Sequence, residues 1–218
     1  MPSLAAKLWN NAGMLDEMAF PETIETERLV LRRYTSADAA GILELVEQNR
    51  GLLTREFPQM AKELIGVEEA KSFVEEKLQQ RESRETFCYG IWRKSSKEQI
   101  GQIQAKNIAW EIPAAELGYF IGSAWQRRGY ASESVAAILR VAFQELEFQR
   151  IFVRILPSNK ESLSLAKKLG FQEEGLQRNA FRCGFGELHD VRYLSITAED
   201  YRLPRGKGEK RNTKMENW

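Results

Sequence analysis

Cysteine and histidine are scarce in this chain, and their scarcity excludes several kinds of site. The 218 residues include two cysteines, Cys88 and Cys183, and one histidine, His189. Cysteines so far apart form no CxxC pair, which argues against a disulfide framework or a cysteine zinc site and favours a reducing, cytoplasmic compartment. A single histidine excludes histidine-rich metal sites and the HExxH motif. We therefore expect no metal site.

The chain also lacks an excess of one charge and any long apolar run. Its 32 basic and 31 acidic residues give a formal net charge of +1, whereas a dedicated nucleic-acid binder usually has a strong basic excess. No apolar run approaches 18 residues, so we expect no membrane-spanning segment. Neither a GxSxG elbow nor a GxxxxGK[ST] loop occurs, which removes one common nucleophile motif and one common phosphate-binding motif.

The remaining composition suits one globular domain with two flanking segments. Hydrophobic residues make up 43% of the chain and charged residues 29%, which is enough apolar material for a single sizeable core. We expect an N-terminal leader over residues 1–24, either partly ordered or not, a folded domain over 25–201 and a basic, flexible tail over 202–218. The tail could alternatively serve as a weak electrostatic contact with an acidic partner such as ribosomal RNA.

Hydrophobic periodicity predicts a mixed α/β domain. The expected order is one strand, helices, three antiparallel strands, a helix, a strand, a second helix and two further strands, which is not the pattern of two separate layers. The expected strands are 28–34, 86–93, 99–108, 115–121, 150–156, one that starts at 171, and 187–197. The expected helices are 39–48, 67–84, 129–147 and 159–169, with a short helix and a loop between 49 and 65.

One loop between a strand and a helix has the features of an anion site. The strand ends near Gly122, and the sequence Gln126-Arg127-Arg128-Gly129-Tyr130-Ala131 leads directly into the helix. Such a loop aims unpaired backbone N–H groups and the positive end of the helix dipole at one point, which suits a pyrophosphate. A Cβ at Gly129 would collide with the anion, and Arg127 and Arg128 add charge at the rim. An ordinary strand-to-helix turn is the alternative interpretation of this loop taken alone.

Three further segments accompany this loop at the spacing of a known family. The loop resembles the Q/R-x-x-G-x-G/A motif of the GNAT acetyltransferase superfamily. Asn159-Lys160-Glu161-Ser162 with Leu169-Gly170-Phe171 is similar to a second family segment. The stretch 26–32 (TERLVLR) and the stretch 186–193 (GELHDVRY) resemble the beginning and end of the branch that contains the RimJ/RimL ribosomal-protein N-acetyltransferases. The resemblance covers about residues 25–200.

The resemblance implies a fold and a cofactor. The fold is a strongly twisted mixed sheet of about seven strands with helices on both faces, in which the parallel strands 115–121 and 150–156 splay apart. The cofactor is acetyl-CoA, whose pantetheine arm lies in the opening and hydrogen-bonds to the exposed strand edge. The loop residues 126–131 hold the pyrophosphate, and Asn159 lies on the pantetheine or phosphate side. Backbone N–H groups near Phe120 and Ile121 polarise the thioester carbonyl.

Candidate catalytic residues follow from what direct transfer needs: a neutral amine, an oxyanion donor and an acid for the leaving thiolate. Glu116 is the first candidate base, because it precedes the opening on the strand face opposite Leu117 and Ile121. Glu174 is the second, by resemblance to a glutamate of the RimL-like branch. Both could instead be structural. Ser162 is implied near the thiol sulfur as the acid, or there is no dedicated acid, because positions 164–166 (Ser-Leu-Ala) lack the tyrosine that many members use.

The leading functional hypothesis is an acetyl-CoA-dependent N-acetyltransferase that acts on a protein N-terminal α-amine by direct attack. An α-amino group has a pKa of about 7.7–8.0, against about 10.4 for lysine, so it is easier to deprotonate near neutral pH. A small amine such as an aminoglycoside, a polyamine or an amino acid is the alternative acceptor. A non-catalytic acyl-CoA-binding sensor is the third hypothesis. We expect His189 to pack or hydrogen-bond in the last strand, and a monomer and a homodimer are equally compatible with the sequence.

Overall fold

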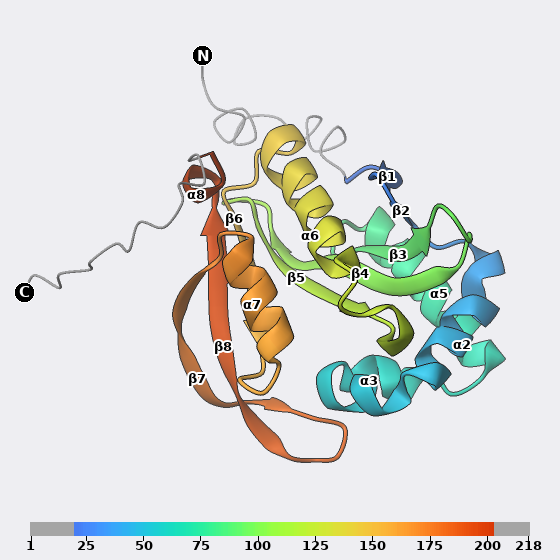
Figure 1. The fold of residues 1–218 in the computed structure, drawn as a ribbon. Coiled ribbons are helices and arrows are strands. Elements are labelled where there is room, and N and C mark those ends of the chain that lie inside the picture. Colours follow the sequence, from blue (N-terminus) through green and yellow to red (C-terminus); the bar gives the residue numbers. More distant parts are fainter. Residues whose placement is uncertain (1–19, 203–218) are drawn as a thin grey trace, which may run out of the picture.

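An open sheet of eight strands forms the centre of the computed structural model, which describes residues 20–202. The strand order is β1-β2-β3-β4-β5-β6-β8-β7, and β5 and β6 are its parallel neighbours. Seven α-helices surround the sheet in this part of the chain (Figure 1). The mixed α/β fold with helices on both faces is therefore confirmed, and the sheet has one strand more than the approximate seven expected.

The strands are β1 (Thr23–Glu25), β2 (Leu29–Arg32), β3 (Phe87–Arg93), β4 (Gln99–Ala109), β5 (Ala114–Ile121), β6 (Arg150–Ile155), β7 (Gln172–Arg182) and β8 (Leu188–Thr197). The α-helices are α2 (Ala39–Gln48), α3 (Arg50–Glu56), α4 (Pro58–Glu63), α5 (Val67–Glu82), α6 (Tyr130–Arg140), α7 (Lys160–Lys168) and α8 (Ala198–Arg202). Short 3₁₀ turns cover Ser36–Asp38 and Ser123–Trp125. A π-helical turn, Val141–Glu145, follows α6.

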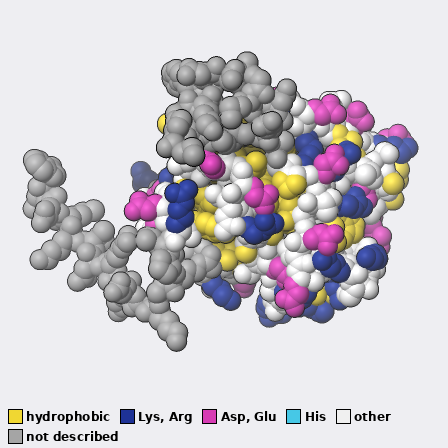
Figure 2. Space-filling model, turned by 90° about the horizontal axis from the view of Figure 1, so that it is seen from above, with side chains coloured by type: hydrophobic (Ala, Val, Ile, Leu, Met, Phe, Trp, Pro, Cys, Tyr) yellow, Lys and Arg dark blue, Asp and Glu magenta, His cyan; other side chains and the backbone are white. Residues whose placement is uncertain are grey.

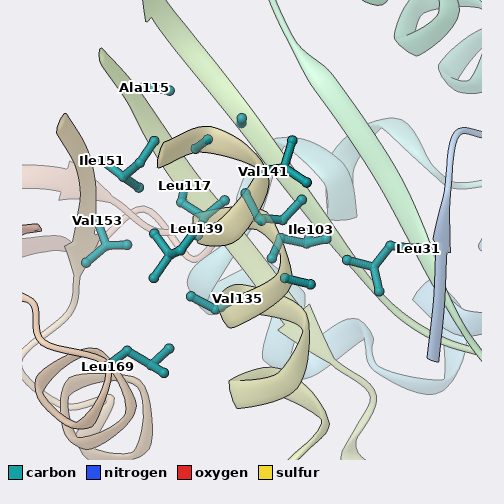
Figure 3. Packing of buried hydrophobic residues seen from close by; sticks show 14 of the residues in the cluster. Leu31, Ile103, Ala115, Leu117, Val135, Leu139, Val141, Ile151, Val153 and Leu169 are labelled. Carbon is teal, nitrogen blue, oxygen red and sulfur yellow. The ribbon is translucent and has the colours of Figure 1, made fainter. Parts of the chain in front are cut away.

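Alternation along the strands divides the core between the two faces of the sheet. One buried cluster joins Leu31, Ile103 and Leu117 to residues of α6 and α7 such as Val135 and Leu163, and Figure 3 shows this packing around α6. A second cluster on the other face joins Tyr34, Cys88 and Phe120 to α2, α3, α4 and α5. Because side chains alternate along a strand, Phe120 packs with the second cluster while Leu117 and Ile121 pack with the first.

Several boundaries differ from the sequence prediction for local reasons. The helix expected over 129–147 ends at Arg140, where the backbone passes into the π-helical turn. The segment 49–65 forms two helices, because Pro58 begins α4 at its first turn, where a missing N–H is tolerated. At the N-terminus, Phe20 and Ile24 are buried in the first cluster.

The rest of the predicted leader and almost all of the predicted tail lie outside the described residues. Between residues 20 and 202, no helix has the length and apolar character needed to cross a bilayer. Basic and acidic side chains alternate over the surface seen in Figure 2, without a continuous field of one sign on that face. That surface agrees with the near-zero net charge of the whole chain.

Candidate active site

The parallel ladder between β5 and β6 stops after three residue pairs. The last pair is Glu116 with Phe152, and β5 continues to Ile121 without a partner strand on that side. We call this opening between β5 and β6 the splay. The predicted separation of these two strands is thus present, and it leaves part of the β5 edge open within the sheet.

The alternation of backbone groups decides which β5 amides face the splay. The N–H of Gly122 donates to the carbonyl of Ile100 across β4, at 2.8 Å. Two residues earlier in the same register, Phe120 therefore directs its N–H toward β4, while Tyr119 and Ile121 direct theirs toward the splay. The Ile121 carbonyl, on the splay side, accepts a bond from Gln126 Nε2 at 3.0 Å. Of the two predicted amide donors, Ile121 faces the splay and Phe120 does not.

The loop before α6 depends on left-handed backbone at two positions. Gly129 precedes the first helical residue with φ +82°, a conformation that side chains rarely adopt. Arg127 also has a positive φ, +59°. The first turn of α6 starts at Tyr130, so its leading N–H groups lack partners within the helix. The left-handed backbone is a further reason for glycine at 129, and the first-turn N–H groups of α6 are the donors that the predicted anion site would use.

A carboxylate from α6 fixes the segment before β2 against this loop. Glu133 accepts hydrogen bonds from Thr26 Oγ1 at 2.6 Å and from the Arg28 backbone N at 2.9 Å. Arg28 also donates through Nε to Glu133 at 2.7 Å and through Nη1 to the Arg128 carbonyl at 3.1 Å. We call Thr26, Arg28 and Glu133 the anchor. In the TERLVLR stretch, Thr26 and Arg28 therefore serve to bind Glu133. The sequence did not predict a role for Glu133.

A cleft of about 420 Å³ opens at the splay, where β5 and the unpaired end of β6 both line it. Its walls come from α3, α4 and α5, from the middle of β4 and β5, from the end of β6, from the start of α7 and from the β7–β8 hairpin. Three predicted site residues line it: Glu116, Asn159 and Ser162. Glu174, Phe120, Ile121 and the loop 126–131 do not.

Glu116 is almost fully buried, with 5% of its surface exposed, and it faces the cleft among polar partners. Asn107 Nδ2 donates to one carboxylate oxygen at 2.7 Å. Arg154 Nε and Lys106 Nζ lie 3.1 Å and 3.5 Å from the other. These contacts satisfy a buried charge that would otherwise destabilise the fold, and they hold the carboxylate in one orientation.

Glu56, on α3, is a second carboxylate in the cleft that the sequence analysis missed. Its Oε2 accepts a bond from Asn159 Nδ2 at 2.7 Å, and the Asn159 Oδ1 accepts from the Ser162 N at 2.9 Å as the N-cap of α7. Burial raises the pKa of the Glu56 carboxyl above its usual range. Glu56 falls in the segment 49–65, whose mixed pattern gave no sign that it would meet α7.

Glu174 lies on β7, apart from the cleft. Both of its oxygens accept from the Arg150 guanidinium, at 2.6 and 2.5 Å, and one also accepts from Ser195 Oγ at 2.6 Å. The hydrogen bonds from Arg150 are the largest influence and lower the pKa of this carboxyl. Its contacts are those of a strand-to-strand ion pair, so the structure brings Glu116 and not Glu174 together with Ser162.

The β7–β8 hairpin carries His189 and Asp190. Asp190 Oδ1 accepts a bond from the Asn179 N at 2.9 Å, which fixes the irregular part of the hairpin. Cys183, Glu187 and His189 each place one donor atom within 4.8 Å of the other two. All three are residue types that can bind metals, and the spacing of the cysteines in the sequence did not suggest this group. Gly184 N donates to the Thr54 carbonyl on α3 at 2.7 Å, so the hairpin tip also contacts a cleft wall.

The anchor gives a prediction about stability and pH. Hydrogen bonds from Thr26 and Arg28 lower the pKa of Glu133 against the opposing effect of burial. A carboxyl whose pKa is lower in the folded state stabilises the fold above its unfolded pKa and loses that effect as the pH falls. Glu133→Gln should therefore unfold at a lower urea concentration than the parent at about pH 7. The difference between the two urea midpoints should be smaller at about pH 3.5.

Urea titrations at both pH values measure this, with Glu47→Gln on the exposed face of α2 as the matched control. An equal difference in urea midpoint at both pH values would show that the packing of the Glu133 side chain, rather than its charge, accounts for the effect.

Comparison with known proteins agrees with this geometry. The family model described as an acetyltransferase (GNAT) domain matches residues 28–172. An uncharacterized N-acetyltransferase, YoaA of Bacillus subtilis, is 31% identical over 173 residues, which cover 79% of this chain and 95% of the relative. The [ribosomal protein uS5]-alanine N-acetyltransferase of Escherichia coli is 27% identical over 182 residues, with 82% and 92% coverage.

A solved structure of RimL, a ribosomal L7/L12 alpha-N-protein acetyltransferase in complex with coenzyme A, superposes with a TM-score of 0.74. It covers 81% of this chain and 98% of that chain at 22% identity, a similarity that supports the fold alone. The family match and the YoaA relative carry the assignment further, because each spans well over half of the chain. The chain therefore belongs to the GNAT acetyltransferase family, in its RimJ/RimL-like branch, and is an N-acetyltransferase.

Proposed function

We propose that this enzyme transfers the acetyl group of acetyl-CoA to the N-terminal α-amine of a protein, by direct attack of the amine on the thioester. One observation carries the proposal: the open edge of β5 lines the cleft that contains Glu116, and β5 then leads into the loop that begins α6. A donor could thus lie along the splay while an acceptor enters from the cleft. The names of the ribosomal-protein relatives add support for the acceptor class.

The residues around the splay fit acetyl-CoA. The first-turn N–H groups of α6 and the guanidinium groups of Arg127 and Arg128 suit the pyrophosphate. The splay-facing amides of Tyr119 and Ile121 suit the pantetheine arm, which can hydrogen-bond to the open β5 edge like an added strand. The Ile121 N–H is also the better of the two predicted donors to the thioester oxygen, where negative charge develops during attack.

The cleft fits an amine acceptor. Its lining carries both signs of charge, from Glu56, Glu63, Glu116, Lys77, Lys106 and Arg154. Glu56 is hydrogen-bonded to the Asn159 amide, which carries no charge, so its carboxylate can attract a positively charged amine. Glu116 then takes the proton of the amine through a water molecule, so that the neutral nitrogen can attack. An α-amine needs less help in this step than a lysine, because its pKa is lower by about 2.5 units. A ribosomal-protein acceptor would place this activity in the cytoplasm.

Acetylation of a synthetic peptide library tests the proposal. Peptides with varied first residues, and in parallel aminoglycosides, polyamines and free amino acids, are incubated with acetyl-CoA, and thiol release is measured. We expect release with a subset of peptides. Release with the small amines alone would overturn the acceptor class, and binding of acetyl-CoA without release to any acceptor would favour a sensor.

The left-handed backbone of the loop gives a prediction about cofactor affinity. Gly129→Val should weaken acetyl-CoA binding at least about tenfold, because a β-branched residue resists φ near +82° and its Cβ would approach Arg28 Nη2 at 3.2 Å. Titration calorimetry measures the affinity. Gly175→Val is the matched control, since Gly175 on β7 has open space around a Cβ and no positive φ. Unchanged affinity in a folded Gly129→Val variant would remove the loop from the proposed site.

The carboxylates of the cleft give a prediction about the base. Glu116→Gln should lower kcat by about 10²–10⁴-fold, the usual contribution of a general base, with little change in acetyl-CoA affinity. The loss should shrink at high pH, where the amine is already neutral. Steady-state kinetics across pH measure both effects.

Two variants accompany that measurement. Glu174→Gln should stay within about threefold of the parent, because Glu174 is paired with Arg150 outside the cleft. Glu56→Gln tests the second carboxylate of the cleft. A normal kcat in Glu116→Gln together with a loss in Glu56→Gln or Glu174→Gln would move the role of base to that residue.

A further inference from the structure

Tyr119 is a polar residue at the splay that the proposed function has used only through its backbone. It lies on β5 between Leu117 and Ile121 and packs against the buried cluster under α6 and α7. Its hydroxyl is buried and has no hydrogen-bond partner. Among the described residues, Arg81 Nη1 and His189 Nε2 are the other buried side-chain atoms without a partner. The side chain nevertheless borders the cleft, as does Ser162.

An unpaired buried hydroxyl destabilises a folded protein, because it has lost its bonds to water without replacing them. Phenylalanine would fill the same space without this cost. The hydroxyl is therefore best explained by a partner that arrives with a ligand. The only part of the proposed substrates that runs along the splay beside Tyr119 is the pantetheine arm, and its sulfur lies where the arm ends.

The position of Tyr119 separates it from the candidate base. Glu116 directs its side chain to the same face of β5 as Phe120, and Tyr119, an odd number of residues further on, directs its side chain to the α7 face, while both residues line the cleft. Attack from one face of the thioester and departure of sulfur on the other would place one group on each side of the reacting carbon. Ser162, from the N-terminal turn of α7, lies on the same side as Tyr119.

The protonation state of Tyr119 suits a proton donor. Burial raises the pKa of its hydroxyl to about 12, and the interaction with the Ser162 side chain lowers this pKa by a smaller amount. The group therefore carries its proton at neutral pH. A phenol is also a stronger acid than the alkyl hydroxyl of Ser162.

We propose that the Tyr119 hydroxyl protonates the departing sulfur of CoA, an inference that rests on the proposed acetyl transfer. The amine nitrogen forms its bond to the acetyl carbon, and its proton passes to Glu116 through water. The carbon–sulfur bond then breaks, its electron pair stays on sulfur, and the Tyr119 O–H proton moves to that sulfur to give the free thiol. The phenolate regains a proton from solvent by way of Ser162. No electron transfer is involved.

Tyr119→Phe tests this directly. We expect the variant to be at least as stable to urea as the parent, since the lost hydroxyl has no partner, and to bind acetyl-CoA with an affinity within about threefold. Its kcat near pH 7 should fall at least about tenfold. The deficit should shrink above about pH 8.5, the ordinary pKa of an alkyl thiol, because a thiolate then needs no proton to depart. Tyr201→Phe, whose ring stacks on Phe143, is the matched control.

Each result has one meaning. A normal kcat in Tyr119→Phe overturns the inference, and if Ser162→Ala loses activity instead, the acid is Ser162. A lower kcat that is independent of pH and accompanied by reduced stability also overturns it, because both then reflect a structural role. If the parent enzyme binds acetyl-CoA but no acceptor releases thiol, the proposed function fails, and this inference fails with it.

Discussion

The early end of the parallel pairing between β5 and β6 is the constraint on which the remaining features depend. Three residue pairs join these strands, and beyond Glu116 the β5 backbone groups on that side are left without a strand partner. Interior strands seldom leave such groups open, since each unmet N–H or C=O is costly once water is excluded. The Gln126 side chain satisfies one of them at Ile121. The rest remain open to a ligand that can act as a strand.

The loop and the cleft are both positioned relative to that opening by contacts distant in sequence. Thr26 and Arg28 hold the first turn of α6 against the start of β2 through Glu133. On the other face, Asn159 joins the cap of α7 to Glu56 of α3. The hydrogen bonds to Glu133 and Glu56 each end on a carboxylate, and hydrogen bonds to a charged group are stronger than those between neutral groups.

The features set by local pattern were predictable from the sequence. Three features can be recognised from a few neighbouring residues: the alternation in 115–121, the glycine before α6 and the asparagine that caps α7. The structure has the corresponding strand, loop and cap. No pattern among neighbouring residues predicts the contacts of Glu133, Glu56 or Tyr119. Glu133 looks like any acidic residue in a first helical turn, and its partners lie more than a hundred residues away. Tyr119 looks like a core aromatic in an alternating strand, and only the packing of α7 decides that its hydroxyl lacks a partner.

The helix α3 is held from two sides by segments that are made much later. Glu56 bonds to Asn159, which is 103 residues further along the chain, and the Thr54 carbonyl accepts from Gly184 in the hairpin between β7 and β8. During synthesis on the ribosome, α3 emerges long before either partner exists. Closing such long loops is slow, since their entropy is lost before the contacts form. The nascent chain should therefore lack a complete cleft wall until nearly all of it has been translated, so the cleft that contains Glu116 is among the last parts of the fold to form.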